Sequence, residues 1–304
     1  MYYPVYGLLY AVSLLPMWIL YTLGDIAGGL LFGFFGYRRQ VVMDNLARAF
    51  PEKSPGELNL IRKRFQRNFT DTFIETVKYL SASETYLRKH VQGNFELFDS
   101  LYQRGLSCQV HMGHNFNWEL LNLSYGIYSK RLPLLGVYMP LENPVMDRIF
   151  RKLRSRTGTI LLPATEMRQA FFPYRNQQYL LGLIADQVPG NISAAFWLYF
   201  FNIPTPFIPG PEKGARAGNI PVVFVHTTRI KRGHYRMNAT LVTETPQTLA
   251  PGELTRLYRD FLEKVMVQHP DMWLWSHRRW KHAWNSSYAS QWIDNTPMPA
   301  SAPR

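Results

Sequence analysis

The chain has 304 residues, of which 46% are hydrophobic and 15% aromatic, and its formal net charge is +13. This composition excludes an intrinsically disordered chain, and the length suits one large α/β domain with an appendage. The excess of cations implies an acidic partner, such as anionic lipid headgroups, an acidic carrier protein or nucleic acid. The single cysteine, Cys108, excludes an intramolecular disulfide, and its apolar surroundings predict a buried thiol rather than a nucleophile.

The first 37 residues are unusually apolar, and Asp25 is their only charged side chain. Residues 5–23 are apolar enough, and nearly long enough, to span a membrane, with a kink expected at Pro16. A secretory signal peptide fits poorly because the basic start and the small-residue cleavage site are missing. A helical hairpin within the core is the other alternative. We expect residues 1–37 to be an N-terminal apolar helical membrane anchor. Arginines follow it directly, so the rest of the chain should face the cytoplasm.

A helix is predicted to begin at Ser54, because residues 54–57 form a capping box with proline at the first helical position. Further along, helix-like segments separate several strand-like runs, which are residues 107–111, 134–138, 159–162, 179–184 and 221–227. This alternation predicts an α/β fold with a mostly parallel central sheet flanked by helices. Residues 233–242 alternate apolar and polar side chains, which indicates an edge strand. A late helix around residues 254–265 should end before Pro270.

The most informative stretch runs from Gln109 to Glu119, where an apolar run ends in Gly113 and His114. It predicts a buried strand, a sharp turn and the start of a helix. A neutral His114 at the turn can take a proton from an alcohol, and the Glu119 carboxylate can orient the ring. A structural histidine at a helix start is the alternative. A metal site with His111 is disfavoured because strand residues three apart point to opposite faces.

Two further pairs are candidate substrate-binding residues. Asp186 and Gln187 follow another strand, so they should approach His114 at the carboxyl edge of the sheet. Asp186 is suited to order a basic group or an acceptor hydroxyl, and a loop cap is the alternative. Arg154 and Arg156 precede a strand and reach the site only if the helix before them points its end there. The alternative is that Arg154 and Arg156 are ordinary solvent-exposed side chains. The several clusters of cations along the chain, taken together, favour a basic surface that faces the membrane.

The residues Gly113-His114-Asn115, Trp118 and Glu119 resemble the His-x4-Glu block of the lysophospholipid acyltransferase superfamily. Over roughly residues 5–284 the chain is similar to the late acyltransferases of lipid A biosynthesis. The other similar positions follow in the family's order: Arg38-Arg39, Asn45-Leu46, residues 49–52, Glu75, Asn143-Pro144, Arg154, Arg156, Gly158, Asp186-Gln187, Gly190, Phe200-Phe201, Pro204, Gly210, Pro221 and residues 277–281. One departure is Met139-Pro140, where many relatives carry Arg-Pro.

The resemblance implies a glycerolipid acyltransferase-like fold and a fatty acyl transfer at the inner membrane. The donor would be an acyl thioester of acyl carrier protein or coenzyme A, and the acceptor a hydroxyl of a lipid A precursor. His114 would be the general base, oriented by Glu119, while Arg154 and Arg156 would bind phosphate or carrier groups. No metal, resident cofactor or nucleic acid partner is implied. A serine acyl-enzyme is disfavoured because the chain has no Gly-x-Ser-x-Gly elbow.

The resulting organisation is a membrane anchor over residues 1–37, an α/β acyltransferase domain over residues 38–285 and a loose tail over residues 286–304. A lysophospholipid or other membrane-lipid acyltransferase with the same machinery is the alternative enzyme. A membrane-anchored binding module is the non-enzymatic alternative, in which basic and aromatic residues 273–281 would bind RNA or acidic lipid. Turnover of a thioester distinguishes these hypotheses. The sequence does not choose the acyl chain length, the donor or the oligomeric state.

Overall fold

The computed structural model describes residues 1–129 and 131–299. Within them the centre is a seven-stranded sheet in the order β1-β9-β8-β2-β5-β3-β4. Its strands are β1 (Val91–Gly93), β2 (Cys108–Met112), β3 (Leu134–Tyr138), β4 (Ile160–Pro163), β5 (Leu180–Ile184), β8 (Val222–Lys231) and β9 (His234–Thr243). Neighbours pair in parallel except β8 and β9, which form an antiparallel hairpin. The α/β class with a mostly parallel sheet is therefore confirmed.

The expected strand runs correspond to β2, β3, β4, β5 and β8, with ends that shift by a few residues. The expectation for residues 233–242 was wrong in one respect, because β9 is not at the edge. The three residues of β1 pair along its outer side, and so short a strand leaves no periodic pattern. A separate hairpin of β6 (Phe196–Phe200) and β7 (Ile203–Phe207) was not predicted. Both turn residues, Phe201 and Asn202, have positive φ. Phenylalanine rarely adopts this conformation, so the sequence did not indicate a tight turn here.

Helices cover both faces of the sheet. On one face α6 (Glu96–Gln103) contacts α7 (Trp118–Tyr128), with Phe98 and Tyr125 in edge-to-face contact at 5.4 Å. On the other face lie α10 (Gly210–Gly218) and α11 (Glu253–Gln268), the expected late helix, where Tyr258 packs on the His111 ring. The remaining helices are α3 (Arg39–Ala49), α5 (Glu84–His90), α8 (Pro144–Ser155) and α9 (Met167–Phe171), with shorter turns η2 (Ala164–Glu166), η3 (Phe172–Tyr174), η4 (Ile192–Ala194), η5 (Pro246–Thr248) and η6 (Ser286–Gln291).

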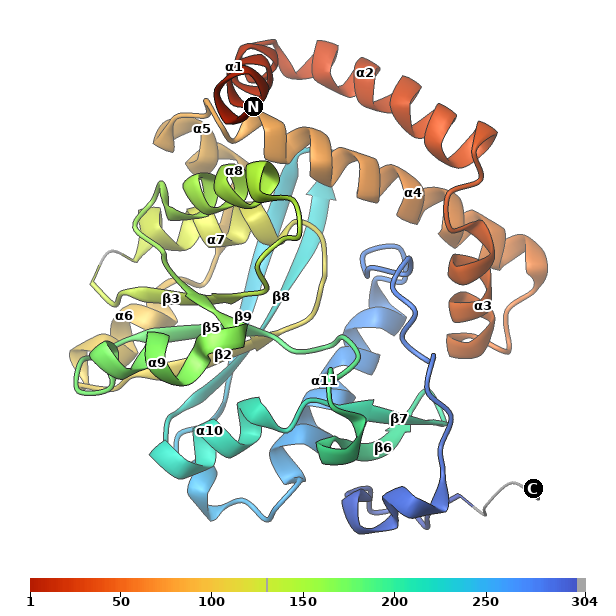
Figure 1. Ribbon diagram of the computed structural model, residues 1–304, viewed down its shortest axis with the longest axis vertical. Helices are drawn as coiled ribbons and strands as arrows, with labels where there is room; N and C mark the ends of the chain where they lie inside the picture. Colours follow the sequence, from red (N-terminus) through yellow and green to blue (C-terminus); the bar gives the residue numbers. More distant parts are fainter. Residues whose placement is uncertain (130, 300–304) are drawn as a thin grey trace.

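The long helix α4 (Pro55–Lys78) crosses the edge of the sheet where β8 ends and β9 begins (Figure 1). It begins at the predicted capping box, since the Ser54 amide donates to Glu57 Oε2 at 2.9 Å and the Glu57 amide donates back to Ser54 Oγ. Arg229 and Arg232, at the β8–β9 turn, both bind the buried Asp71 of α4. Because β8 runs parallel to β2, α4 lies at the carboxyl edge, where ligands of such sheets collect.

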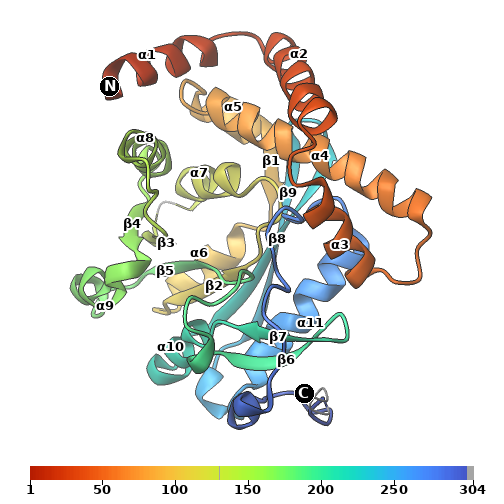
Figure 2. The same ribbon diagram turned by 45° about the vertical axis from the view of Figure 1, so that its right-hand side comes forward.

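The N-terminal helices α1 (Tyr2–Ser13), α2 (Met17–Gly28) and η1 (Gly29–Phe34, a π-helix) lie beyond α4, at the end of the molecule opposite to β6 and β7 (Figure 2). The break between α1 and α2 falls at Pro16, the N-cap of α2. Residues 17–34 are long and apolar enough, by length and composition, to cross a membrane. Only 17% of that segment is buried in the protein, which disfavours the alternative of a core hairpin.

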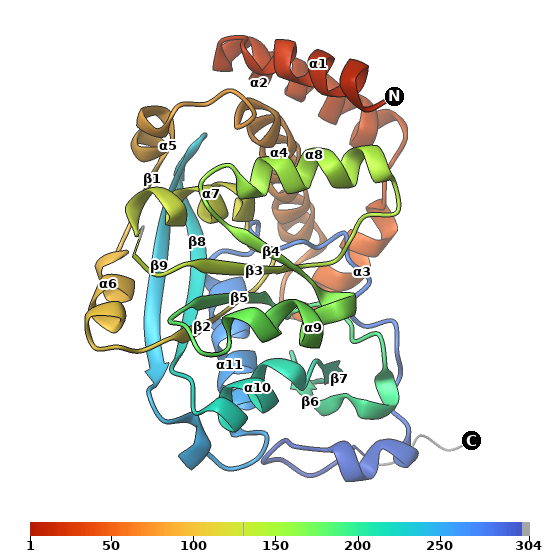
Figure 3. The same ribbon diagram turned by 60° about the vertical axis from the view of Figure 1, so that its left-hand side comes forward.

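Two of the chain's cation clusters turn out to hold these helices in place. Figure 3 shows α1 beside α8, where the Arg148 guanidinium lies 4.0 Å from the centre of the Tyr2 ring. The Lys152 ammonium lies at the same distance over Tyr6. On α2, Asp25 is bound by Arg232 with oxygen–nitrogen distances of 2.6 and 3.0 Å. These cations are therefore not all available to an outside partner.

The C-terminal residues are more ordered than their Ser-, Ala- and Pro-rich composition indicated. Within the described part of the expected tail, Asp294 accepts from Arg259 at 2.9 Å, and the Ile293 amide donates to the carbonyl of Trp197. Trp292 also contacts the Tyr199 ring of β6. An isolated tryptophan and isoleucine thus dock a segment that composition alone describes as loose. Residues 300–304 of the expected tail lie outside the described residues.

Candidate active site

His114 stands in a turn whose two sides are both fixed. On one side every residue of β2 is buried, and the Tyr258 hydroxyl donates to the last carbonyl of that strand, that of Met112, at 2.7 Å. On the other side Asn117 caps α7, because its Oδ1 accepts from the amide of Leu120 at 3.2 Å. The predicted strand, turn and helix start are all present.

Gly113 is required by close packing at this turn. A Cβ atom built there would lie 2.8 Å from a methyl carbon of Leu262 and 3.2 Å from Oδ2 of Asp186. Real Cβ atoms do not tolerate the first distance, so a larger residue forces the Leu262 side chain to shift and crowds the Asp186 carboxylate. The glycine beside the histidine therefore serves the approach of Asp186 to the turn.

Asp186 meets His114 because β2 and β5 are parallel neighbours, with Met112 opposite Ile184. Each side chain stands two residues beyond its strand, at the same carboxyl edge, as the sequence predicted. The Asp186 Oδ1 lies 2.6 Å from His114 Nδ1, and its Oδ2 accepts from the His114 backbone amide at 2.8 Å. This carboxylate holds both the ring and the backbone of the histidine.

The surroundings of Asp186 keep its carboxylate ionised. Burial alone would raise the pKa of this 1% exposed group, but its interaction with His114 and the hydrogen bonds from His114 and Trp273 outweigh burial and lower the pKa. The Trp273 indole N–H donates to Oδ2 at 2.6 Å. An ionised acceptor at Nδ1 fixes the imidazole tautomer with its proton on Nδ1, which leaves Nε2 as the basic nitrogen.

The Nε2 of His114 is not engaged by Asp186, and the ring is partly exposed. The imidazole is 19% exposed, and the Trp118 ring meets it edge to face at 5.3 Å between ring centres. The side-chain nitrogen of Gln187 lies 3.3 Å from Nε2, which is long for a hydrogen bond. An incoming hydroxyl can displace so weak a contact. Asp186 itself sits behind the ring, so its expected role in binding substrate directly is not supported by its position.

The expected contact between Glu119 and His114 is absent from the described structure. Glu119 is 3% exposed, and its Oε1 accepts from Arg154 at 2.5 Å from Nη2 and 3.0 Å from Nε. Burial lowers the pKa of Arg154, but the ion pair with Glu119 outweighs burial and raises it. The reason is direction: from the first turn of α7 the carboxylate faces α8 and not the preceding turn. The carboxylate that orients His114 comes from a different strand.

The sequence profile of the bacterial lipid A biosynthesis acyltransferases matches residues 1–282. The chain belongs to this family. It is 24% identical to the lipid A biosynthesis lauroyltransferase of Escherichia coli K12 over 90% of this chain and 89% of that protein. It is 20% identical, over the same shares, to the lipid A biosynthesis palmitoleoyltransferase of Escherichia coli K12 and to a lipid A biosynthesis acyltransferase of Shigella flexneri. The protein is therefore an acyltransferase, as the resemblance implied.

The two arginines predicted to bind substrate in this acyltransferase lie in different places. Arg154 of α8 reaches α7 at Glu119, close to the histidine turn. Arg156 instead donates to the backbone carbonyls of Tyr79 and, at 2.7 Å, of Ala82, beyond the carboxyl end of α4. A cation there satisfies helix carbonyls that have no intrahelical partner. Its expected role in binding phosphate is not supported by this position.

The tryptophans that the binding-module hypothesis needed are buried in the acyltransferase, although Arg278 and Lys281 of the same segment are exposed. Trp273 and Trp275 are 1% and 0% exposed, and Arg279 is fully buried over the Phe207 ring. Burial lowers the pKa of Arg279 to about 10. Side chains without access to solvent offer no stacking platform to RNA. Trp273 supports Asp186 instead, a role that its sequence neighbours did not signal.

Glu75 links the histidine turn to the rest of the acyltransferase. The sequence showed where Glu75 lies relative to the family's pattern but not what it binds. Its carboxylate accepts from Asn117 at 2.9 Å and from the hydroxyls of Tyr21 and Tyr235 at 2.8 Å each. Burial raises the pKa of Glu75, and the three donors act against burial by favouring the charged form. Because Tyr21 lies on α2, a single buried carboxylate connects the N-terminal helices with the cap of α7.

Proposed function

We propose that this acyltransferase moves a fatty acyl chain from a thioester to a hydroxyl of a lipid A precursor. His114 Nε2 takes the hydroxyl proton as the oxygen attacks the thioester carbonyl carbon. The carbon–sulfur bond then breaks, and the thiolate receives the proton from the imidazolium. The observation that supports this most is the 2.6 Å contact between Asp186 Oδ1 and His114 Nδ1, in a partly exposed imidazole whose Nε2 is left for the substrate. A buried carboxylate there stabilises the imidazolium that forms in the transition state.

We assign Glu119 and Arg154 to positioning. Their ion pair joins the first turn of α7 to α8, and both side chains are largely buried. This pair fixes the helix that carries the N-cap Asn117 at the end of the histidine turn. Gln187 is proposed to contact the acceptor, because its amide lies where the attacking hydroxyl must approach Nε2.

The comparisons support a fatty acyl donor, since two of the related proteins are named for lauroyl and palmitoleoyl transfer. A net charge of +13 favours acyl carrier protein, an acidic partner, over coenzyme A. We propose the inner membrane as the location, with the sheet domain on the cytoplasmic side.

We propose further that α1, α2 and η1 lie in the membrane interface instead of crossing the bilayer. One side of α2 packs along α4 through Leu20 and Gly24, and Asp25 is paired with Arg232. A spanning orientation would draw this ion pair and the cations of α4 into hydrocarbon. The outer side carries exposed apolar residues that suit an interface: Tyr3, Leu8, Leu14, Trp18, Leu23, Ile26, Leu30, Phe34 and Phe35.

Membrane placement is tested with the exposed residues Trp18, Leu30 and Phe34 replaced together by serine. These side chains make little contact with the protein, so folding is retained while membrane affinity falls. Cell fractionation should move the triple variant from the membrane to the soluble fraction. Unchanged membrane association would contradict an interfacial anchor on this face.

The activity is tested with purified full-length protein, a lipid A precursor and acyl thioesters of either acyl carrier protein or coenzyme A. Mass spectrometry should find one additional acyl chain on the precursor, with the carrier protein as the faster donor. A lysophospholipid is offered in parallel as the alternative acceptor. Transfer to the lysophospholipid alone would replace the proposed acceptor, and absence of transfer to both would overturn the reaction.

A further inference from the structure

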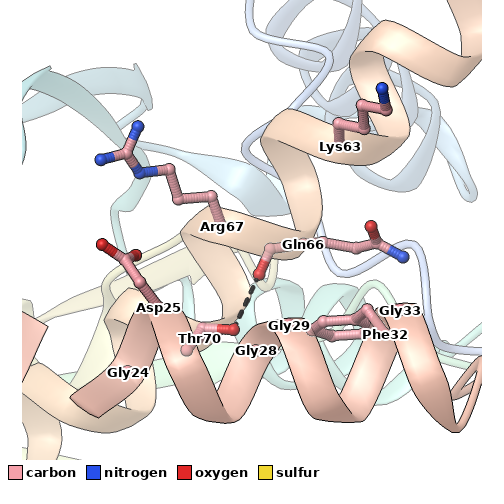
Figure 4. A pocket seen from close by; sticks show the side chains of 10 residues that line it. All are labelled: Gly24, Asp25, Gly28, Gly29, Phe32, Gly33, Lys63, Gln66, Arg67 and Thr70. Carbon is pink, nitrogen blue, oxygen red and sulfur yellow. Dashed lines mark hydrogen bonds between the residues drawn. The ribbon is translucent and has the colours of Figure 1, made fainter. Parts of the chain in front are cut away.

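A pocket of about 470 Å³ opens between the N-terminal helix α2–η1 and α4 (Figure 4). It lies apart from the histidine turn. One wall comes from the apolar helix and the other from the middle of α4, between Lys63 and Thr70. Its lining residues are Gly24, Asp25, Gly28, Gly29, Phe32, Gly33, Lys63, Gln66, Arg67 and Thr70.

The glycines of this wall have two different roles. A Cβ at Gly24 would lie 2.8 Å from Ile74, and a Cβ at Gly28 would lie 2.8 Å from Thr70. These two glycines therefore allow α2 to pack against α4. A Cβ at Gly29 or Gly33 would meet nothing within 4 Å. Helix packing therefore does not require the second pair, and its missing side chains are what leave the pocket open.

A buried hydrogen-bond donor lines the pocket. Gln66 is 9% exposed, and its Oε1 accepts from Arg62 Nη1 at 2.9 Å. Its Nε2 has no hydrogen-bond partner among the described residues. Figure 4 shows the Gln66 amide extending alongside Phe32 and Gly33. An unpaired buried N–H group costs about 1–3 kcal/mol, so the pocket favours an occupant that accepts a hydrogen bond.

The charge around the pocket is positive. Lys63 and Arg67 are exposed at its rim, and Arg62, 8% exposed behind Gln66, is bonded to the neutral acceptors Asn59 and Gln66. None of these three cations makes an ion pair within the described chain. Asp25 is the one acid of the lining, and Arg232 already binds both of its oxygens. The chemistry that fits is an anion with several acceptor oxygens.

The position of the pocket identifies the source of that anion. Ile26 and Leu30, on the same helix, are exposed by 57% and 54% and face the proposed membrane. An anion bound between this helix and the cations of α4 would lie at headgroup depth. On the inner side Phe32 packs on Phe69 at 5.6 Å, and Phe69 packs in turn on Phe116 of the histidine turn. These rings separate the pocket from His114.

We propose that this pocket binds the phosphate of an anionic membrane phospholipid, as a headgroup site separate from the acceptor that is acylated. The phosphate oxygens accept from Gln66 Nε2 and lie between Lys63 and Arg67, while the acyl chains follow the exposed side of η1 into the bilayer. Bound lipid then fixes α2–η1 against α4, which carries Phe65 and Phe69 onto Phe116. This proposal rests on the interfacial placement of the helices and not on the acyl transfer reaction.

The test is native mass spectrometry of the full-length protein in neutral detergent, with phosphatidylglycerol or phosphatidylcholine added. Two variants act on the pocket differently: Gly33→Leu fills it at constant charge, and Arg67→Gln removes a rim cation. Their matched controls are Gly7→Leu, a second glycine with open space at its Cβ, and Arg64→Gln, an exposed cation of α4 outside the lining. Wild type and controls should retain one phosphatidylglycerol, and both pocket variants should bind it about tenfold or more weakly.

Three outcomes would overturn the proposal. Equal retention by pocket variants and controls means that phosphatidylglycerol is held by general surface attraction only. Displacement of the lipid by inorganic phosphate at matched concentration means that the pocket takes a free anion. If instead Gly33→Leu raises the KM for the lipid A precursor in phospholipid-free detergent, the pocket holds the acceptor itself. The binding measurement needs no turnover, so it stands even if the proposed reaction fails.

Discussion

The carboxyl edge of the sheet and the N-terminal helices differ in how far their side chains are buried and hydrogen-bonded. At the edge, the groups around His114 are largely buried and joined by short hydrogen bonds. Asp186 accepts from His114 and from Trp273, and Tyr258 of α11 donates to the end of β2. At the N-terminus, large apolar side chains such as Trp18 and Phe34 are exposed by 70% and 80%. These helices contact the body through glycines, tyrosines and one ion-pair network. One region is built for fixed geometry and the other for contact with a surface.

With the proposed placement at a membrane, the difference teaches how one chain can keep a reaction site rigid while its N-terminal helices adapt to a surface. Catalytic groups need positions fixed to fractions of an ångström, which buried and fully bonded side chains provide. An interfacial helix needs only an apolar face and a stable direction. Glu75 is where the two meet, since it accepts from Tyr21 on α2 and from Asn117 at the catalytic turn.

The largest effect should come from His114→Ala at the rigid edge. Removing a general base costs about 10²–10⁴-fold in kcat/KM, and the fold should persist because the imidazole makes one strong side-chain bond. Steady-state kinetics and circular dichroism measure the two effects, with His282→Ala as a control outside the turn. A variant with near-normal turnover would remove the central claim of the mechanism.

Asp186→Asn comes next and distinguishes the two candidate carboxylates. The loss in kcat should be at least about tenfold and no more than that of the histidine variant. Because the carboxylate stabilises the imidazolium, its loss should move the acidic limb of the pH–rate profile to lower pH. The pKa of Asp186 is lower in the folded protein than its unfolded value of about 3.9, so the ionised carboxylate stabilises the fold at any pH above that value. This contribution to the free energy of unfolding is lost as the pH falls through the folded pKa. An unshifted profile would contradict an orienting role.

How far the sequence predicted this edge can be argued residue by residue. The strand, the turn and the helix start are local patterns, and so were visible from Cys108 to Trp118. The approach of Asp186 to His114 was predicted too, because each residue follows a strand. Its direct bond to Nδ1 was not predicted, because Asp186 lies 72 residues away and the contact depends on β5 being the neighbour of β2. The predicted contact of Glu119 with His114 is not made, because proximity along the chain does not determine the direction of a side chain on a helix, and this carboxylate binds Arg154 instead.

The N-terminal helices, in contrast, were predictable from local composition. Their composition predicted an exposed apolar segment without any knowledge of tertiary contacts, and the break at Pro16 followed from proline's effect on helices. What composition did not predict is that Gly24 and Gly28 press α2 onto α4, or that Arg232 joins Asp25 to Asp71. Long-range packing was therefore hidden in both regions, although only at the sheet edge does it change the assignment of a functional residue.

Glu119→Gln should act on stability before chemistry. The amide oxygen can accept from Arg154 but carries no charge, and a partly buried cation left without its acid costs about 1–3 kcal/mol. Denaturant unfolding should show this loss, while kcat under conditions that keep the protein folded should fall less than in Asp186→Asn. A kcat loss as large as that of His114→Ala in a stable protein would return Glu119 to the catalytic group.

Arg156→Lys tests a residue that the sequence assigned to substrate. A lysine cannot reach the carbonyls of Tyr79 and Ala82 together, so the variant should lose about 0.5–1.5 kcal/mol of stability. KM should stay at the wild-type value at low and high salt, since no phosphate contact is lost. A raised KM that salt reproduces, with unfolding unchanged, would restore the substrate-binding role.

The smallest effect is expected from Asp25→Asn at the adaptable end. The Asp25 side chain is 51% exposed, and ion pairs of that kind contribute about 0.2–1 kcal/mol. Asp71→Asn is the matched comparison, because Asp71 is fully buried between Arg229 and the same Arg232, and its loss leaves both guanidinium groups without their shared acid. Asp71→Asn should therefore have a much lower melting temperature than Asp25→Asn. The turnover and membrane association of Asp25→Asn should stay close to those of the wild type. If Asp25→Asn instead reduces turnover strongly, the direction of α2 is fixed by this pair, and the anchor belongs with the rigid region that positions His114.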